Sequence, residues 1–155
     1  DMILYFGDDA KRINHALKVY GFAKAICESE DVSGNEREII ELTAILHDIG
    51  IREAERKYNS SAWNYQETEG PPVAREILEK NGIADKITDR VCFIIGHHHR
   101  FDKIDGIDFQ ILVESVLLVN IFEHGSSKES AESVKNSVFK TQAGIKLLDS
   151  IYLSS

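Results

Sequence analysis

Several features that mark other classes of protein are scarce in this sequence. Among its 155 residues are two cysteines, Cys27 and Cys92, and two prolines, which are adjacent at positions 71 and 72. No apolar run approaches the ~20 residues that a membrane-spanning helix needs. One Asn-Gly pair occurs, at positions 81 and 82, and no alternating strand pattern flanks it. These scarcities argue against a disulfide-stabilised small domain, a membrane protein and a fold built from β-hairpins.

Positively charged residues are also relatively few. The chain has 18 lysines and arginines and 26 aspartates and glutamates, which gives a net charge of −8. A nucleic-acid polymer or an anionic membrane needs a basic surface, so neither is expected as a partner. A small phosphorylated substrate remains compatible with this balance, since a few local cations or a metal can hold it. The first eight residues lack the basic start and the cleavage site of a secretory signal. Together with cysteines set in apolar patterns, this predicts a cytoplasmic protein with reduced thiols, and a homo-oligomer is left open.

The length suits one compact domain covering residues 1–155, and the hydrophobic pattern predicts that it is all-α. Apolar residues recur at three- and four-residue spacing after Asp8 or Asp9, which predicts a first helix to about Cys27. A second helix should end near Gly50, placed as a left-handed C-cap. The segments 59–65 and 97–108 are predicted to be loops, and the Pro71-Pro72 pair to open a helical turn. Further helices are expected over 52–58, 73–80, 85–96, 109–122, 128–139 and 141–152.

Five of the six histidines fall into three groups, namely His15, the pair His47-Asp48 and the run His97-His98-His99. Alone, His15 would be typical of a half-buried core imidazole, and His47-Asp48 of a helix cap. Three consecutive histidines at the end of an apolar helix are poor for stability unless something binds them. Imidazole and carboxylate are the usual ligands of a divalent metal. Their spacing matches no local zinc motif, so such ligands would have to converge from separate helices.

Taken together, these segments resemble the HD-domain superfamily of metal-dependent phosphohydrolases. The resemblance rests on Arg12–His15, Leu46–Gly50, Ile94–His99 and Ile111–Ser115, and it covers most of the chain. It implies an HD-type helical bundle that holds a divalent ion, which could be Mn, Mg, Co, Ni, Fe or Zn. The activity that it implies is hydrolysis of a small phosphoester, with nucleotides among the candidates.

The resemblance also implies roles for individual residues. It makes His15, His47 and Asp48 the ligands of one ion, with His47 and Asp48 at the catalytic centre. In the same pattern, His97 and His98 would hold a second ion or the substrate. Arg12 lies one turn before His15 on the same helix face and could clamp a phosphate, although a solvated arginine is an equal alternative. Weaker candidates for binding the substrate are Lys57, His99 and Arg100.

The sequence departs from the family pattern at its last ligand. The expected aspartate falls on Val116, which cannot bind a metal. Glu114 stands two residues earlier, about 200° around the helix, and would need a register shift to act as a substitute ligand. Its alternative role is to pair with a neighbouring helix. The missing aspartate therefore leaves a second hypothesis, a catalytically impaired HD module that binds a nucleotide or a protein partner.

A second departure precedes Pro71, where related two-metal members carry another histidine. This chain has Gln66, Glu67 and Glu69 there, which puts a complete two-metal site in doubt. Glu67 or Glu69 could act as a general base, but capping a helix at Pro71 is the preferred interpretation.

Nearby, Trp63 and Tyr65 could stack on a base or pack over the end of the bundle. Oxidation by a bound iron, known among HD relatives, is favoured by no residue of this chain.

Overall fold

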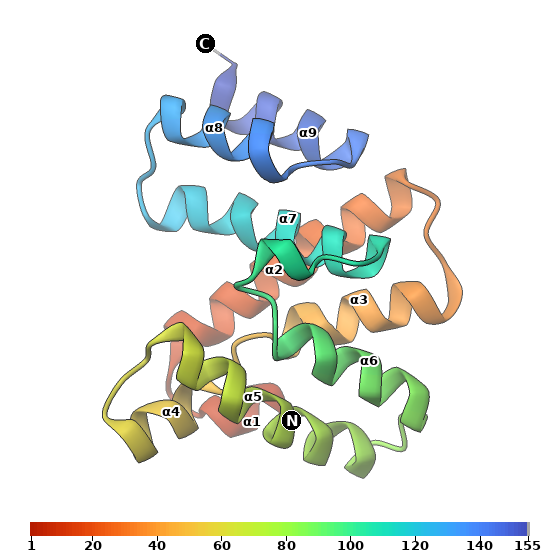
Figure 1. Cartoon of the computed structure of the whole chain (residues 1–155), viewed down its shortest axis with the longest axis vertical. Helices are drawn as coiled ribbons and strands as arrows, with labels where there is room; N and C mark the ends of the chain where they lie inside the picture. The colour runs from red at the N-terminus through yellow and green to blue at the C-terminus, as the bar shows by residue number, and fades with distance from the viewer. Residues whose placement is uncertain (155) are drawn as a thin grey trace.

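The computed structural model describes residues 1–154, which form helices and no strand, so the prediction of an all-α fold is confirmed. Figure 1 shows the course of the chain. No helix within the described residues combines the length and apolar character needed to cross a bilayer. The α-helices are α1 (Met2–Phe6), α2 (Ala10–Ser29), α3 (Gly34–Leu46), α4 (Ile51–Tyr58), α5 (Trp63–Lys80), α6 (Asp85–Ile95), α7 (Ile107–Glu123), α8 (Lys128–Val138) and α9 (Gln142–Leu148). A 3₁₀ helix, Phe101–Lys103, precedes α7, and a π-helical turn, Asp149–Leu153, follows α9.

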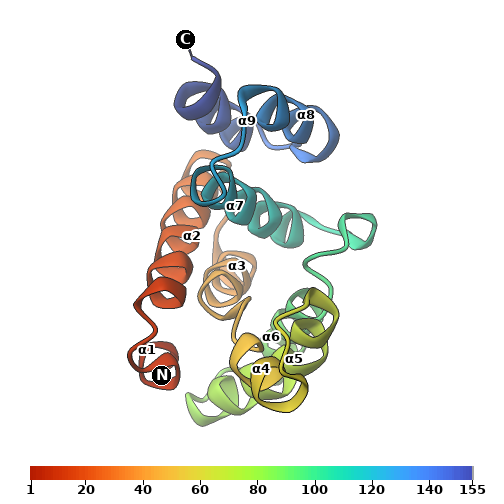
Figure 2. The same ribbon diagram turned by 90° about the vertical axis from the view of Figure 1, so that its left-hand side faces the viewer.

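Three helices, α2, α3 and α7, pack against one another at the centre of the molecule. Because α7 is apolar almost all round, it is buried on most of its surface. Figures 1 and 2 show α8 and α9 as an outer pair against α7, and α4, α5 and α6 as a group at the other end, where α6 packs against α3. The packing of α2, α3 and α7 brings the first half of α2 to the C-terminal end of α3, where His15 meets His47, and to the C-terminal end of α7, where His15 meets Glu123.

The start of α2 follows the predicted pattern. Asp9 is its N-cap, and the Asp9 Oδ1 atom accepts a hydrogen bond from the Arg12 backbone N–H at 3.1 Å. Such a cap satisfies one of the amide groups left free at a helix start. With the helix beginning at Ala10, Arg12 and His15 are three residues apart and lie on the same side of α2.

The fifth helix corrects the sequence prediction. α5 begins at Trp63 and runs through Pro71 and Pro72, whereas a loop over 59–65 and a helix start after the prolines were expected. Two interior prolines remove two amide donors from a helix. Burial of Ala74 and Leu78 in the core shared with α6 offsets this loss. Glu67 and Glu69 therefore lie inside the helix, and neither caps a helix start at Pro71.

Gly50 also differs from its predicted role as a left-handed cap. Its backbone is right-handed, with φ of −74° and ψ of −13°. The glycine is required for a close crossing, because a Cβ atom there would lie 2.5 Å from the Gly70 nitrogen and 2.5 Å from the Gln66 carbonyl oxygen. The absence of a side chain thus lets the turn after His47-Asp48 rest directly on α5.

The two cysteines are free and buried, as predicted. Burial raises the pKa of the Cys27 thiol to about 11. Burial raises the pKa of the Cys92 thiol as well, so both thiols remain protonated near neutral pH and serve as small apolar core residues.

Candidate metal centre

Four side chains from three separate parts of the chain converge beside α2. His15 lies in the first half of α2, His47 and Asp48 follow the last residue of α3, and His98 follows α6. The His15 Nε2 atom is 3.2 Å from His47 Nε2 and 3.5 Å from Asp48 Oδ2, and His47 Nε2 is 3.3 Å from Asp48 Oδ2. His98 Nε2 is 3.7 Å from Asp48 Oδ1. We call these four residues the His/Asp cluster.

Two of the three imidazoles are oriented by the ends of their own helices. His47 Nδ1 lies 2.9 Å from the Ala44 carbonyl oxygen, and His98 Nδ1 lies 2.9 Å from the Ile95 carbonyl oxygen. Carbonyl oxygens accept hydrogen bonds and the last turn of a helix leaves them free, so each Nδ1 donates. The same local arrangement therefore recurs at the end of α3 and just after α6, and each ring turns Nε2 towards Asp48.

Burial and charge make the cluster receptive to a cation. Burial works to raise the pKa of Asp48, but His47 and His98 lower it by more, so this pKa is well below its usual value. Burial also works against protonation of His47, but Asp48 reverses this and the pKa of His47 is raised. The cluster thus favours positive charge at its centre, which a proton or a metal ion can supply.

One buried atom of the cluster has no hydrogen-bond partner among the described residues. His98 Nε2 is buried and makes no hydrogen bond in the structure, although buried polar atoms are nearly always paired. Ligand atoms of His15, His47 and Asp48 all lie within 4.8 Å of one another. Neutral imidazole and carboxylate groups at such spacing suit a divalent transition metal, so the residues present fit the ion that the sequence analysis expects.

The three consecutive histidines do not act alike. His97 belongs to neither group of candidate ligands and does not line the cavity over the cluster. Its ring stacks on Phe93, and its Nδ1 lies 2.7 Å from the Phe93 carbonyl oxygen. The suggestion that His97 is a ligand is therefore corrected, because the turn after α6 directs its side chain elsewhere. His99 instead groups with Asp48 and His98. Burial and the neighbouring His98 lower the pKa of His99 to about 4.

Glu114 does not replace the missing aspartate, and this suggestion is corrected too. Its carboxylate is fully buried on the opposite side of α7 and accepts hydrogen bonds from the backbone N–H groups of Lys140 and Thr141 at 2.6 and 3.0 Å. The side chains of Gln110 and Thr141 also donate to it. Glu114 therefore anchors the segment before α9. Val116, about 200° around the helix from Glu114, lines the same cavity as the cluster.

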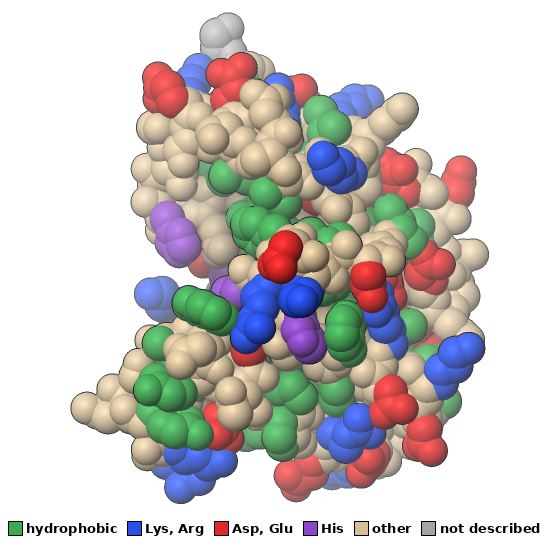
Figure 3. All heavy atoms as spheres, viewed as in Figure 1, with side chains coloured by type: hydrophobic (Ala, Val, Ile, Leu, Met, Phe, Trp, Pro, Cys, Tyr) green, Lys and Arg blue, Asp and Glu red, His purple; other side chains and the backbone are tan. Residues whose placement is uncertain are grey.

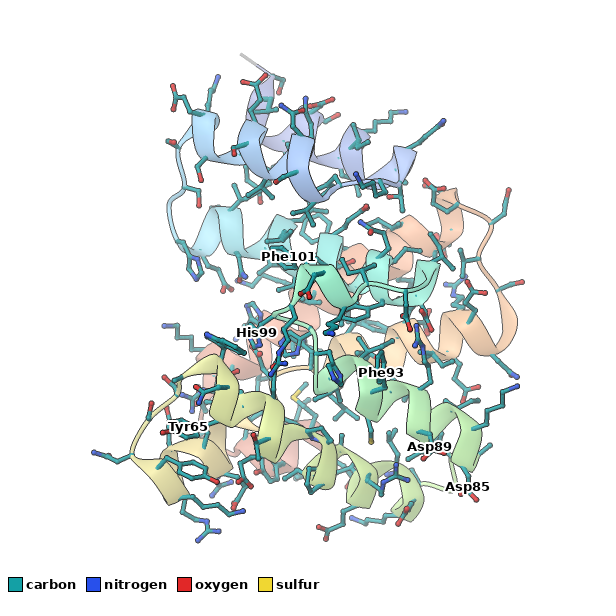
Figure 4. The ribbon with its side chains drawn as sticks, viewed as in Figure 1. Tyr65, Asp85, Asp89, Phe93, His99 and Phe101 are labelled. Atoms are coloured by element: carbon teal, nitrogen blue, oxygen red, sulfur yellow. The ribbon has the colours of Figure 1, made fainter. Side chains whose placement is uncertain are left out.

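A cavity of about 610 Å³ opens over the cluster. In Figure 3 the surface is indented at mid-height on the left, with histidine side chains beside and within the indentation. Figure 4 shows His99 and Phe101 on the segment between α6 and α7. Around the cluster, the residues that line the cavity include the apolar Ile51, Phe101, Val113, Val116 and Leu117 and the polar Lys11, Arg12, Gln66, His99, Asn120, Glu123 and His124.

The predicted substrate-binding cations separate into two groups. Arg12 lines the cavity, where Asp9 at 2.8 Å and Glu55 at 2.5 Å hold its guanidinium. Lys57 lies on α4 and pairs with Glu69 beside a different cavity, so its proposed contact with substrate is corrected.

Around α5, the remaining residues that the sequence analysis singled out have local partners. Arg100 pairs with Glu67 at 2.9 Å, and its guanidinium lies 5.4 Å from the centre of the Trp63 ring. Tyr65 stacks on Tyr58 with ring centres 4.2 Å apart, so it packs within the protein.

Sequence reasoning missed Glu123, the last residue of α7. Its Oε2 atom is 2.7 Å from His15 Nδ1, and its Oε1 atom is 2.5 Å from Lys18 Nζ. Its spacing could have indicated a role at the site. Glu123 follows Val116 by seven residues, or about two helical turns, so both lie on the same face of the helix.

Comparison with known proteins gives one family match. The model of the HD domain family matches residues 12–138. No match is found among the curated proteins or among the solved structures. The matched range includes His15, His47, Asp48 and His98, and it extends over α7 to the end of α8.

Proposed function

Because the chain belongs to the HD domain family, whose members are typically metal-dependent phosphohydrolases, we propose that it hydrolyses a small phosphoester with the help of a divalent cation. The observation that carries the proposal is the convergence of three imidazole Nε2 atoms on one carboxylate, each with its Nδ1 already engaged. A divalent cation bound there lowers the pKa of water and offsets negative charge on a phosphate. His15, His47 and Asp48 would hold it, with His98 as a further ligand.

The cavity provides groups of the kind that a phosphoester needs. Arg12 lies at the cavity wall, and its ion pairs with Asp9 and Glu55 fix the guanidinium before substrate arrives. A pre-positioned cation binds an anion without a further loss of side-chain freedom. His99 stays neutral at pH 7 because its pKa is about 4. It would therefore orient water or substrate as a hydrogen-bonding group.

The opposite wall supports a substrate with an apolar or aromatic part. Val113, Val116 and Leu117 on α7 and Phe101 line the cavity, and Phe101 is 45% exposed. These side chains place an apolar surface beside the cluster, and electrostatic interactions are stronger in less polar surroundings. Nucleotides are among the phosphoesters that combine a charged end with a flat, less polar one.

The test measures phosphate release from generic phosphoesters with Mn²⁺, Co²⁺, Ni²⁺ or Mg²⁺. We expect His47→Ala and Asp48→Ala to lose activity by more than about 100-fold, since each removes a ligand. His97→Ala is the matched control, because His97 is bonded to its own helix and lies outside the cluster. Retained activity in both the His47 and the Asp48 variants would contradict the proposal.

Val116 favours a second candidate, a module that binds a nucleotide or protein partner without catalysis. α7 supplies no ligand at the position where the family pattern has an aspartate, because Val116, which lines the cavity there, is apolar. Metal analysis of untagged protein separates the two. Less than stoichiometric metal, with no hydrolysis after metal is added, supports the binding module, whereas a bound ion and metal-dependent turnover support the hydrolase.

A further inference from the structure

Glu123 connects α7 to the His/Asp cluster without touching the cation position itself. One of its carboxylate oxygens lies 2.7 Å from His15 Nδ1 and the other 2.5 Å from Lys18 Nζ. His15 Nδ1 is on the opposite side of the ring from Nε2, which faces His47 and Asp48. The side chain of Glu123 is 20% exposed, and its carboxylate joins the end of α7 to two residues of α2, His15 and Lys18.

The position of His15 explains why it needs this partner. His47 and His98 follow helix ends and bond free backbone carbonyls of their own chain segments. His15 lies in the interior of α2, where backbone carbonyls already accept hydrogen bonds from amides four residues ahead. An acceptor for its Nδ1 must therefore come from a side chain, and Glu123 supplies it from another helix.

Glu123 meets His15 as a carboxylate that is already ion-paired with Lys18. Its Oε1 atom lies 2.5 Å from Lys18 Nζ, and its Oε2 atom lies 2.7 Å from His15 Nδ1. An ionised carboxylate accepts hydrogen bonds and donates none. The proton between the two residues thus resides on His15 Nδ1, and Nε2 keeps a free lone pair.

We propose that Glu123 is a positioning residue that sets the tautomer and the ring orientation of His15 for binding the cation. Metal-ligating histidines commonly donate their second ring N–H to a carboxylate in this way. The inference rests on the proposed cation site. It assigns α7 an indirect part in that site: the helix lacks a ligand at Val116 but holds a ligand of α2 through Glu123, two turns further on.

The first measurement is the affinity for Mn²⁺ or Co²⁺ alone, by titration calorimetry. We expect Glu123→Ala to weaken binding about 10- to 100-fold. Glu123→Gln keeps an acceptor oxygen, so its affinity should lie within a few-fold of the wild-type value. Lys18→Met is the matched control, because it removes the other contact of Glu123 and leaves His15 untouched. Wild-type affinity in Glu123→Ala would overturn the proposal, as would equal losses in all three variants.

The second measurement needs no metal. Nitrogen-15 NMR of the metal-free protein should show His15 with its proton on Nδ1, and Glu123→Ala should shift it towards Nε2. His47 is the internal reference, since its Nδ1 bonds a backbone carbonyl and should keep its proton in every variant. A wild-type His15 protonated on Nε2 alone, or a tautomer unchanged in Glu123→Ala, would overturn the proposal.

The two measurements also separate this inference from the proposed activity. A wild-type protein that binds metal and shows the Nδ1 tautomer but hydrolyses no phosphoester would refute the hydrolase and leave the role of Glu123 supported. An active wild-type enzyme with an equally tight-binding Glu123→Ala variant would refute the role of Glu123 alone. Thermal unfolding of each variant shows whether a loss of affinity comes from a loss of fold, and Glu123→Gln retains the hydrogen bond if Glu123→Ala does not fold.

Discussion

The Nε2 atoms of His15 and His47 lie 3.2 Å apart, although each ring has its Nδ1 directed at an oxygen acceptor. Two lone pairs at this distance repel unless a positive charge lies beside them. Asp48, 3.5 Å from His15 Nε2 and 3.3 Å from His47 Nε2, adds negative charge to the same point. α2 and the turn after α3 thus hold together three groups that suit a shared cation, and the following predictions test what each part of this arrangement contributes.

The neighbouring histidines after α6 should respond differently to the same substitution. His98→Ala removes a buried Nε2 atom that faces Asp48 and should weaken Mn²⁺ or Co²⁺ binding by about tenfold or more. His97→Ala removes a ring that is bonded to Phe93 and lies outside the cluster, so its affinity should equal that of the wild type. Metal titration of both variants checks this. Equal losses would show that the turn after α6 does not separate their roles.

Val116→Asp should add a ligand where α7 now presents an apolar side chain. Since Val116 lines the cavity over the cluster, we expect divalent-metal affinity to rise by about tenfold. Without metal, the same variant should be less stable than the wild type because it adds an unpaired carboxylate to the wall of a cavity that Asp48 already lines. Val116→Asn is the size-matched control. If both variants bind metal no better than the wild type, position 116 does not reach the ion.

Glu114 should matter for folding and not for the site. Glu114→Gln replaces an acceptor of the Lys140 and Thr141 amides with a group that also donates. We expect a loss of about 2 kcal/mol or more in the free energy of unfolding, since a buried network is left unsatisfied. Metal affinity of the folded protein should not change. Urea unfolding gives the first quantity and metal titration the second, with Glu132→Gln at an exposed position as the control.

Two glycine substitutions should have opposite effects on stability. Gly50→Ala puts a Cβ atom 2.5 Å from backbone atoms of α5, so it should destabilise the protein by more than about 2 kcal/mol. Gly21→Ala, in the interior of α2 with nothing within 4 Å of the new atom, should stabilise by up to about 1 kcal/mol. Thermal unfolding of the two variants checks this. A neutral Gly50→Ala would refute the close crossing of Gly50 and Gly70.

Glu69 should make stability depend on pH in the acid range. Its hydrogen bond with Lys57 lowers the pKa of Glu69 below the usual 4.5, and Tyr58 contributes in the same direction. A carboxyl whose pKa is lower in the folded state contributes stability that is complete above its unfolded pKa and is lost as pH falls through the folded value. Glu69→Gln should therefore be less stable than the wild type at pH 7, and the difference should shrink below about pH 4.5. Urea unfolding from about pH 3 to 7 measures this, and a difference that does not change with pH would contradict it.

Much of the fold could be predicted because the relevant signals are local. The N-cap Asp9, the apolar spacing along α2 and the unbroken apolar run of α7 depend on residues within a few turns of one another. The His47-Asp48 pair was recognisable for the same reason. The prediction that Pro71 opens a helix was wrong, because contacts with α6 keep α5 helical through both prolines.

The candidate site shows most clearly which features follow from the sequence and which depend on tertiary packing. The order of amino acids was sufficient to indicate an all-helical chain and to single out imidazoles and a carboxylate as candidate ligands, which the fold brings together. It was not sufficient to choose between neighbours such as His97 and His98, or to find Glu123 and dismiss Glu114. Each residue turns a helix by about 100°, so whether a side chain reaches a site depends on how whole helices rotate and cross. That is settled when α2, α3, α6 and α7 pack together, and contacts across more than a hundred residues, such as that between His15 and Glu123, exist only in the packed molecule.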